Sequence, residues 1–122
     1  MKYKPLSVRA RLKSFGFAFK GIRGFFWQEP NARLHLVATL AVLSAGIFCS
    51  ITNNEMIALV VATGFVWAAE IINTAIERIM DFISTDRDPK IELIKDLAAG
   101  AVLVSAITAI VVAALVFIPK LF

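Results

Sequence analysis

Three long apolar segments constrain the fold more than any other feature of the sequence. The last of them, Leu97–Ile118, contains no charged residue, and two others precede it at Leu34–Ile51 and Met56–Phe82. A helix of about 20 residues crosses the hydrocarbon core of a bilayer, so all three segments are long enough to span it. Lipid offers no hydrogen-bond partners to open backbone groups, so a spanning segment must be a helix. The sequence therefore predicts an all-α membrane protein with three transmembrane helices.

The composition agrees with a membrane location. The chain has 122 residues, of which 59% are hydrophobic, and its mean hydropathy is +0.79. A soluble domain of this length has too little interior to bury so many apolar side chains. The single cysteine, Cys49, excludes an intramolecular disulfide and a cysteine-rich metal site. We interpret residues 1–122 as one membrane domain.

The basic residues are distributed unevenly along the chain. Four lie at or between the ends of the second and third apolar segments, and one, Lys120, lies near the C-terminus. Eight precede the first segment: Lys2, Lys4, Arg9, Arg11, Lys13, Lys20, Arg23 and Arg33. The positive-inside rule then predicts a cytoplasmic N-terminus, a cytoplasmic 83–96 loop and an outward C-terminus. The net charge of +4 follows this pattern and forms no patch for nucleic acid, so no nucleic-acid partner is expected.

The N-terminal segment, residues 6–28, differs from the spans. Its apolar residues recur at three- and four-residue spacing, with basic residues between them: Leu12, Phe15, Phe19, Ile22 and Phe26. This pattern predicts an amphipathic helix that lies on an anionic membrane surface. Pro30 then allows the chain to turn into the first span. We expect the transmembrane helices at 32–51, 56–82 and 96–118.

A polar stripe interrupts the second span. Glu70, Asn73, Glu77 and Asp81 recur at i, i+3, i+7 and i+11, which places them on one helix face over about 16 Å. An ionisable residue inside a membrane costs a few kcal/mol and marks a functional site by default. Two structural alternatives stay open. Glu70 would then only hydrogen-bond a neighbouring helix, and Asn73 would only contribute to helix packing.

Other charged residues lie at the same membrane surface: Glu29 before the first span, and Lys95 and Asp96 before the third. Carboxylates such as Glu29 and Glu77 are the hard oxygen ligands that Mg²⁺ takes together with phosphates. Lys95 supplies a mobile charge for a phosphate, and the deeper Glu70 suits a general base. These are the parts of a phosphoryl-transfer site, although the sequence has no Walker-type glycine loop.

Four motifs carry a family resemblance: FKGIR at Phe19–Arg23, Glu29 with Arg33, EIINTAIERIMD at Glu70–Asp81, and KDLAAGAV at Lys95–Val102. With them, nearly the whole chain resembles the small integral-membrane diacylglycerol kinases of bacteria, a family that includes undecaprenol kinases. The resemblance implies a homotrimer in the bacterial inner membrane. Each protomer would have a surface helix and three spans, and each active site would lie between protomers.

The resemblance also implies a role for each matching residue. Glu70 matches the base for the lipid hydroxyl, and Asn73 matches the polar residue beside it. The metal ligands would be Glu29 and Glu77. The nucleotide would lie near Lys95, which contacts ATP phosphates, and near Asp81, Asp96, Glu77 and Glu29. The implied cofactor is Mg²⁺, the phosphoryl donor is ATP, and the remaining partners are membrane lipids and the lipid alcohol.

The lipid acceptor stays open at this stage. In the diacylglycerol-specific branch a glutamate stands two residues after the first-span arginine, whereas this chain has His35 there. The stretch RLHLV and the ending VFIPKLF resemble the undecaprenol-kinase branch. His35 itself is interpreted either as an interfacial polar residue or as a metal ligand.

The sequence therefore predicts a lipid kinase that uses ATP and Mg²⁺ at the cytoplasmic leaflet, with diacylglycerol or undecaprenol as acceptor. The main alternative is a small proton-coupled exporter, in which Glu70 binds protons and cationic drugs. An exporter needs one deep carboxylate, and it does not need Glu29, Glu77, Asp81 and Lys95 at one membrane surface. A non-catalytic membrane subunit or a decayed kinase is the third possibility, although the intact polar set argues against decay.

Overall fold

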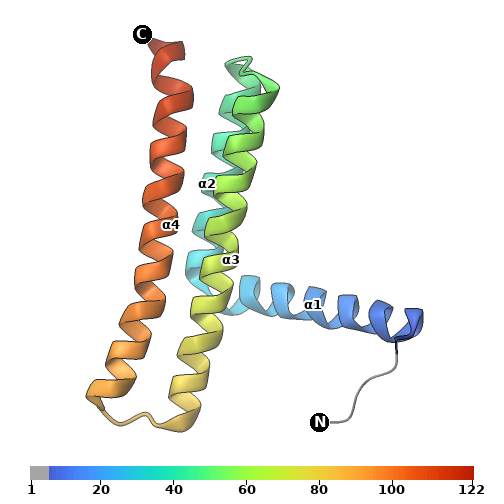
Figure 1. Cartoon of the computed structure of the whole chain (residues 1–122), viewed down its shortest axis with the longest axis vertical. Helices are drawn as coiled ribbons and strands as arrows, with labels where there is room; N and C mark the ends of the chain where they lie inside the picture. Colours follow the sequence, from blue (N-terminus) through green and yellow to red (C-terminus); the bar gives the residue numbers. More distant parts are fainter. Residues whose placement is uncertain (1–5) are drawn as a thin grey trace.

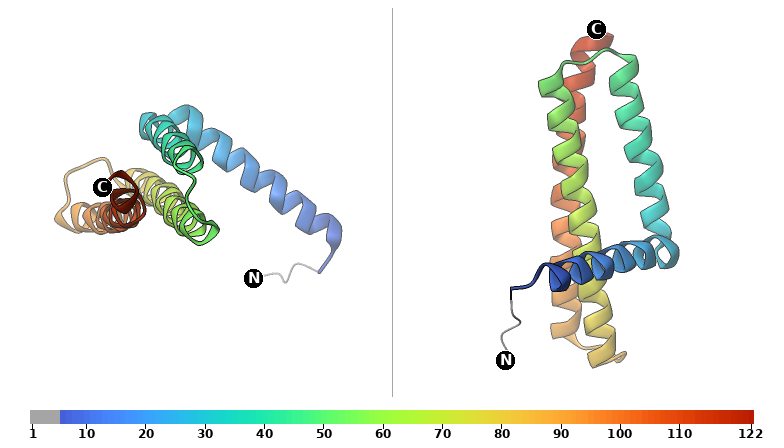
Figure 2. Two further views of the ribbon diagram at one scale, coloured as in Figure 1. Left: turned by 90° about the horizontal axis from the view of Figure 1, so that it is seen from above. Right: turned by 90° about the vertical axis from the view of Figure 1, so that its right-hand side faces the viewer.

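The structure, a computed structural model, describes residues 6–122 as four helices, with no strand among them. The helices are α1 (Val8–Gln28), α2 (Pro30–Phe48), α3 (Asn53–Ile83) and α4 (Pro89–Leu121). Helices α2, α3 and α4 run side by side, and α1 leaves the bundle crosswise (Figures 1 and 2). Each of the three bundle helices is long and apolar enough to cross a membrane. The predicted fold class is confirmed. Lys2 and Lys4, used for the predicted orientation, lie outside the described residues.

Local capping explains where the helices begin. Thr52 and Glu55 form a capping box at the start of α3, in which each side chain satisfies a free backbone N–H group. Asp88 accepts a hydrogen bond from the Lys90 backbone, and Pro89 occupies the first turn of α4, where its missing N–H is not needed. Helix α4 therefore starts before the apolar run. The α3–α4 connection is the short segment 84–88, and the longer 83–96 loop expected from the charges is not observed.

The junction between α1 and α2 sets the crosswise position of α1. Glu29 has an extended backbone (φ −109°, ψ 113°) and is followed by Pro30 at the start of α2, as expected for a residue before proline. Phe25 and Phe26 then pack against Trp67 of α3, with ring centroids 6.2 and 5.2 Å apart. These contacts attach the end of α1 to the middle of α3.

Much of the apolar side of α1 is exposed in the single chain, although Phe26 near its end packs against Trp67. Leu12, Phe15 and Phe19 are exposed, while α1 and α3 enclose a groove of about 780 Å³ that is lined in part by Lys20, Arg23 and Arg78. Exposed aromatic and aliphatic side chains on a basic helix suit a position against lipid. We expect this helix to lie at the membrane surface.

Helices α3 and α4 extend past the level of α1, at the end that carries their short connection (Figures 1 and 2). The buried residues of α3 follow helical spacing and include Leu59, Ala62, Val66, Glu70 and Thr74. Most large apolar side chains remain exposed in the single chain, as a bilayer or neighbouring chains allow. Glu70 thus lies within the bundle, and Asp81 lies on the exposed end of α3.

Candidate active site

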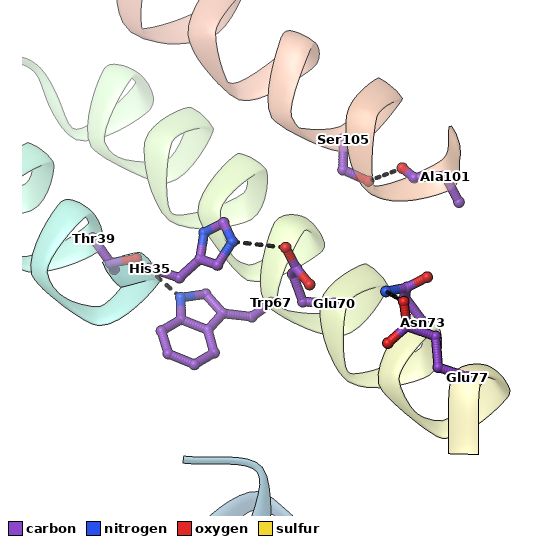
Figure 3. Close-up of polar contacts among 8 residues, drawn as sticks. All are labelled: His35, Thr39, Trp67, Glu70, Asn73, Glu77, Ala101 and Ser105. Atoms are coloured by element: carbon purple, nitrogen blue, oxygen red, sulfur yellow. Dashed lines mark hydrogen bonds and ion pairs between the residues drawn. The ribbon is translucent and has the colours of Figure 1, made fainter. Parts of the chain in front are cut away.

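The deepest charged group of the bundle is the carboxylate of Glu70, a residue that is only 9% exposed. Its Oε1 atom lies 2.8 Å from Nε2 of His35 on α2, and Figure 3 shows the two side chains directed at one another. A buried carboxylate needs a hydrogen-bond donor, and a donor from an imidazole makes a charge-assisted bond. Helix α2 supplies this donor to the predicted base.

The imidazole of His35 lies against a second contact between the same helices. Its ring meets the Trp67 indole edge-on, at 6.4 Å between centroids, and Trp67 Nε1 donates a hydrogen bond to Thr39 Oγ1 at 2.9 Å. Thr39 follows His35 by one helical turn (Figure 3). An indole N–H inside an apolar segment requires such an acceptor. The two hydrogen bonds fix the rotation of α2 relative to α3.

Asn73 and Glu77 form the next part of the stripe, one and two turns further along α3. Asn73 Nδ2 donates to Glu77 Oε1 at 3.4 Å, whereas Asn73 Oδ1 is buried without a partner among the described residues. A buried amide oxygen without a donor is unfavourable by about 1–3 kcal/mol. This orphaned oxygen beside a carboxylate is a place where a donor or a cation would bind.

Glu29 lies at the start of α2 and contacts α3. Its Oε1 atom accepts a hydrogen bond from Arg78 Nη2 at 3.2 Å. Arg78 directly follows Glu77 in α3, so Glu29 lies near the level of Glu77 on the bundle. The structure records no contact between Glu29 and Glu77 within residues 6–122. The two predicted metal ligands are therefore near one level of the bundle but are not brought together in one chain.

Lys95 and Asp81 connect α4 to α3 beyond the level of α1. Lys95 Nζ lies 2.5 Å from Asp81 Oδ1, and their side chains are 35% and 58% exposed. A partly exposed pair of this kind contributes at most about 1 kcal/mol, so Lys95 can exchange this partner for a phosphate at little cost. Asp96 is exposed and has no hydrogen bond or ion pair to the residues that the structure describes.

The oxygen donors on α3 are of the type that binds a magnesium ion, but residues 6–122 do not supply a full set of ligands. Residues 6–122 hold no cluster of three or more His, Cys, Asp or Glu side chains that could bind a metal. Mg²⁺ usually takes one or two carboxylates and completes its octahedron with waters and substrate phosphates. The Glu77 carboxylate and the orphaned Asn73 Oδ1 are hard oxygen donors of that kind. Because an amide can rotate to exchange its oxygen and nitrogen, both groups can face one cation.

Sequence reasoning identified the carboxylates of the stripe but missed two of their partners. The sequence allowed His35 to be an interfacial residue or a metal ligand, whereas in the structure it bonds Glu70. Arg78 was counted only among the four basic residues at or between the ends of the second and third apolar segments, yet it binds Glu29. One sequence signal could have indicated the first pair, namely a single histidine in one apolar span and a single deep glutamate in the next.

Comparison with known proteins gives a consistent result. Residues 16–117 match the prokaryotic diacylglycerol kinase family. The undecaprenol kinase of Bacillus subtilis (strain 168) is 36% identical over 109 residues, which are 89% of each chain. The diacylglycerol kinase of Synechocystis sp. is 31% identical over 90% of this chain and 63% of its own length. That of Escherichia coli K12 is 27% identical over 82% of each chain. The chain thus belongs to the prokaryotic diacylglycerol kinase family and is a lipid kinase of that family.

Proposed function

We propose that this membrane protein transfers the γ-phosphoryl group of ATP to the hydroxyl group of a lipid alcohol, diacylglycerol or undecaprenol. One observation carries the proposal. A buried carboxylate, Glu70, lies on the same helix as a row of polar groups that ends at the Asp81–Lys95 pair beyond the surface helix. A lipid hydroxyl at the membrane surface and a water-soluble nucleotide can both reach such a row. The family membership and the names of the relatives support the same chemistry.

The phosphoryl transfer forms one bond to phosphorus and breaks another. The lipid hydroxyl oxygen bonds to the γ-phosphorus while the bond between that phosphorus and the β–γ bridging oxygen breaks, and ADP leaves. Glu70 accepts the hydroxyl proton, as a general base within hydrogen-bond reach of the acceptor. Lys95 leaves Asp81 and holds a phosphate oxygen, since its ammonium is a mobile point charge. Asp81 and Asp96 flank the nucleotide.

Glu77 and Glu29 would hold the magnesium ion, with Asn73 available beside Glu77. When bound, Mg²⁺ neutralises negative charge on the phosphate oxygens. The contribution of this chain is the set of hard oxygen atoms on α3 and at the start of α2. Glu29 is occupied by Arg78 in the single chain, so its carboxylate must exchange this partner or meet the metal from a neighbouring protomer.

The proposal includes a homotrimer with active sites shared between protomers. It is supported by the position of Glu29, which pairs with Arg78 and not with Glu77 in the single chain, and by the large apolar surface left exposed on α2, α3 and α4. It also includes an orientation in the bacterial inner membrane. The N-terminus and the 84–88 connection would be cytoplasmic and the C-terminus outside, as the basic residues predict, so the lipid is phosphorylated in the cytoplasmic leaflet.

A side-by-side kinase assay tests the proposal. The purified protein is incubated with ATP and Mg²⁺ in mixed micelles that contain diacylglycerol, undecaprenol or no lipid alcohol, and ADP and phosphorylated lipid are measured together. We expect equal amounts of ADP and phospholipid with at least one lipid and neither product without one. A protein that is folded and yet phosphorylates neither lipid would contradict the assignment. The ratio of the two rates identifies the preferred acceptor.

A further inference from the structure

The proposed reaction gives no role to His35, although this residue contacts Glu70. The bond is 2.8 Å long and joins α2 to α3, and the two side chains are 29% and 11% exposed. Among the described residues, His35 is the one hydrogen-bond partner of this carboxylate. A carboxylate with a single donor on one oxygen has its second oxygen available for another proton.

The imidazole is held in place by its surroundings. Trp67 packs edge-on against the His35 ring and is itself fixed by the hydrogen bond from its Nε1 to Thr39. Phe26 of α1 also packs against the indole, with 5.2 Å between centroids. The direction of Nε2 is therefore set by packed aromatic rings from α1 and α3, and Figure 3 shows it aimed at Glu70.

We propose that His35 is a positioning residue for the catalytic base. Its Nε2–H group donates to Glu70 Oε1 and fixes the plane of the carboxylate, so that Oε2 remains free to take the proton of the lipid hydroxyl. The inference rests on the proposed function, because it requires Glu70 to be the base. It goes beyond that function by giving α2 a part in the proton transfer.

A positioning role differs from a role in helix packing in its kinetic effect. His35 contacts the base and no group assigned to the nucleotide or the metal, so its loss should lower kcat and leave the KM for ATP nearly unchanged. Small misplacements of a reacting group cost up to about a hundredfold in rate. We expect a tenfold to hundredfold lower kcat, roughly, for His35→Leu. In His35→Gln the amide nitrogen can replace Nε2 as donor, so kcat should return to within about fivefold of the wild type.

A matched control exists one turn along α2. Thr39→Val keeps the side-chain shape and removes the other α2–α3 hydrogen bond, from Trp67 Nε1 to Thr39 Oγ1. If hydrogen bonds between these helices matter only for packing, Thr39→Val should reduce kcat as much as His35→Leu does. We expect Thr39→Val to lower the melting temperature in detergent, because a lost neutral hydrogen bond affects stability by about 1 kcal/mol. It should reduce kcat much less than His35→Leu does, because the Phe25 and Phe26 rings still pack against Trp67 and the bond from His35 to Glu70 is kept.

The experiment measures kcat and the KM for ATP in mixed micelles for these variants, for Glu70→Gln and for the double variant His35→Leu/Glu70→Gln. Because His35 acts through Glu70, the double variant should be no slower than Glu70→Gln alone. Equal losses in Thr39→Val and His35→Leu, or independent losses in the double variant, would overturn the proposal. A folded His35→Gln with a kcat as low as that of His35→Leu would also overturn it. If His35→Leu does not fold, the kcat of His35→Gln alone tests the proposal, and a loss of more than about fivefold would contradict it. If Glu70→Gln keeps full activity, the base assignment itself fails, whereas an inactive Glu70→Gln beside a fully active His35→Leu removes only the positioning role.

Discussion

The substitution Glu70→Gln tests the central assignment with the least disturbance to the structure. Glutamine has the shape of glutamate, and its Oε1 can still accept the hydrogen bond from His35 Nε2, which is 2.8 Å long in the structure. A bond to a charged group contributes about 1.5–3 kcal/mol and a neutral one about 0.5–1.5 kcal/mol. The weaker hydrogen bond therefore lowers the stability by about 1 kcal/mol. The substitution also removes a charge from inside a span, which costs a few kcal/mol, and this offsets the loss. We therefore expect unchanged or slightly greater thermal stability.

The effect of Glu70→Gln on catalysis should be much larger. Loss of a general base typically lowers the rate by about 10²–10⁴-fold, which corresponds to about 2.7–5.4 kcal/mol of transition-state stabilisation at about 1.36 kcal/mol per factor of ten. The assay is the initial rate of lipid phosphorylation at saturating ATP, with a thermal melt of the same detergent sample. Glu55→Gln is the matched control, because Glu55 lies at the other end of α3 and pairs with Lys120 at 3.6 Å. A folded Glu70→Gln with a rate within tenfold of the wild type would refute the reasoning.

Three further predictions concern the charged groups. Glu77→Ala should raise the Mg²⁺ concentration needed for half-maximal rate, and its activity should partly recover at high Mg²⁺. The exposed control Glu92→Ala should not change the Mg²⁺ concentration needed. If Glu77→Ala leaves the Mg²⁺ dependence unchanged, Glu77 is not a metal ligand. Lys95→Ala should raise the KM for ATP several-fold and leave the melting temperature nearly unchanged. Lys120→Ala, at the far end of α4, should leave the KM for ATP unaltered. If the two variants change this KM equally, Lys95 acts through helix packing and not through a phosphate. At low Mg²⁺, where Glu29→Ala and Glu77→Ala should each be nearly inactive, mixed trimers of the two variants should regain part of the activity, measured after verified chain exchange.

Much of the fold could be predicted from local sequence because the membrane restricts the choice of structure. An uncharged stretch such as Leu97–Ile118 has to be a helix. The spacing of apolar and basic residues predicted an amphipathic helix in the N-terminal segment, whereas its crosswise position depends on the junction at Glu29 and Pro30. The connection between α3 and α4 was predicted too long. The charges between 83 and 96 suggested a loop, yet the Asp88–Pro89 pair starts α4 as an N-cap and a first-turn proline do, so charged residues form the first turns of the helix.

The candidate site could be predicted only along a single helix. Helical spacing placed Asn73 beside Glu77, and the structure joins them by a hydrogen bond. The pairing of Glu70 with His35 depends instead on how far α2 is rotated against α3. That rotation is set by the packing of Trp67 against Phe25 and Phe26 and by its bond to Thr39. No local pattern encodes it, because apolar spans carry little periodicity to distinguish one face from another.

The position of Glu29 explains why partial recovery is expected in mixed trimers. Its carboxylate accepts a hydrogen bond from Arg78, and successive residues of a helix point about 100° apart, so Arg78 and Glu77 face different sides of α3. A metal held by Glu29 and Glu77 of one chain would require Glu29 to leave Arg78. A metal held between chains would not, because the Glu77 that meets Glu29 would belong to the neighbour. In a closed ring each interface then needs an intact Glu29 from one protomer and an intact Glu77 from the next, which random mixing of equal amounts provides at about a quarter of the interfaces. If both ligands come from one chain, every chain in the mixture is damaged and the activity stays at the level of the unmixed variants.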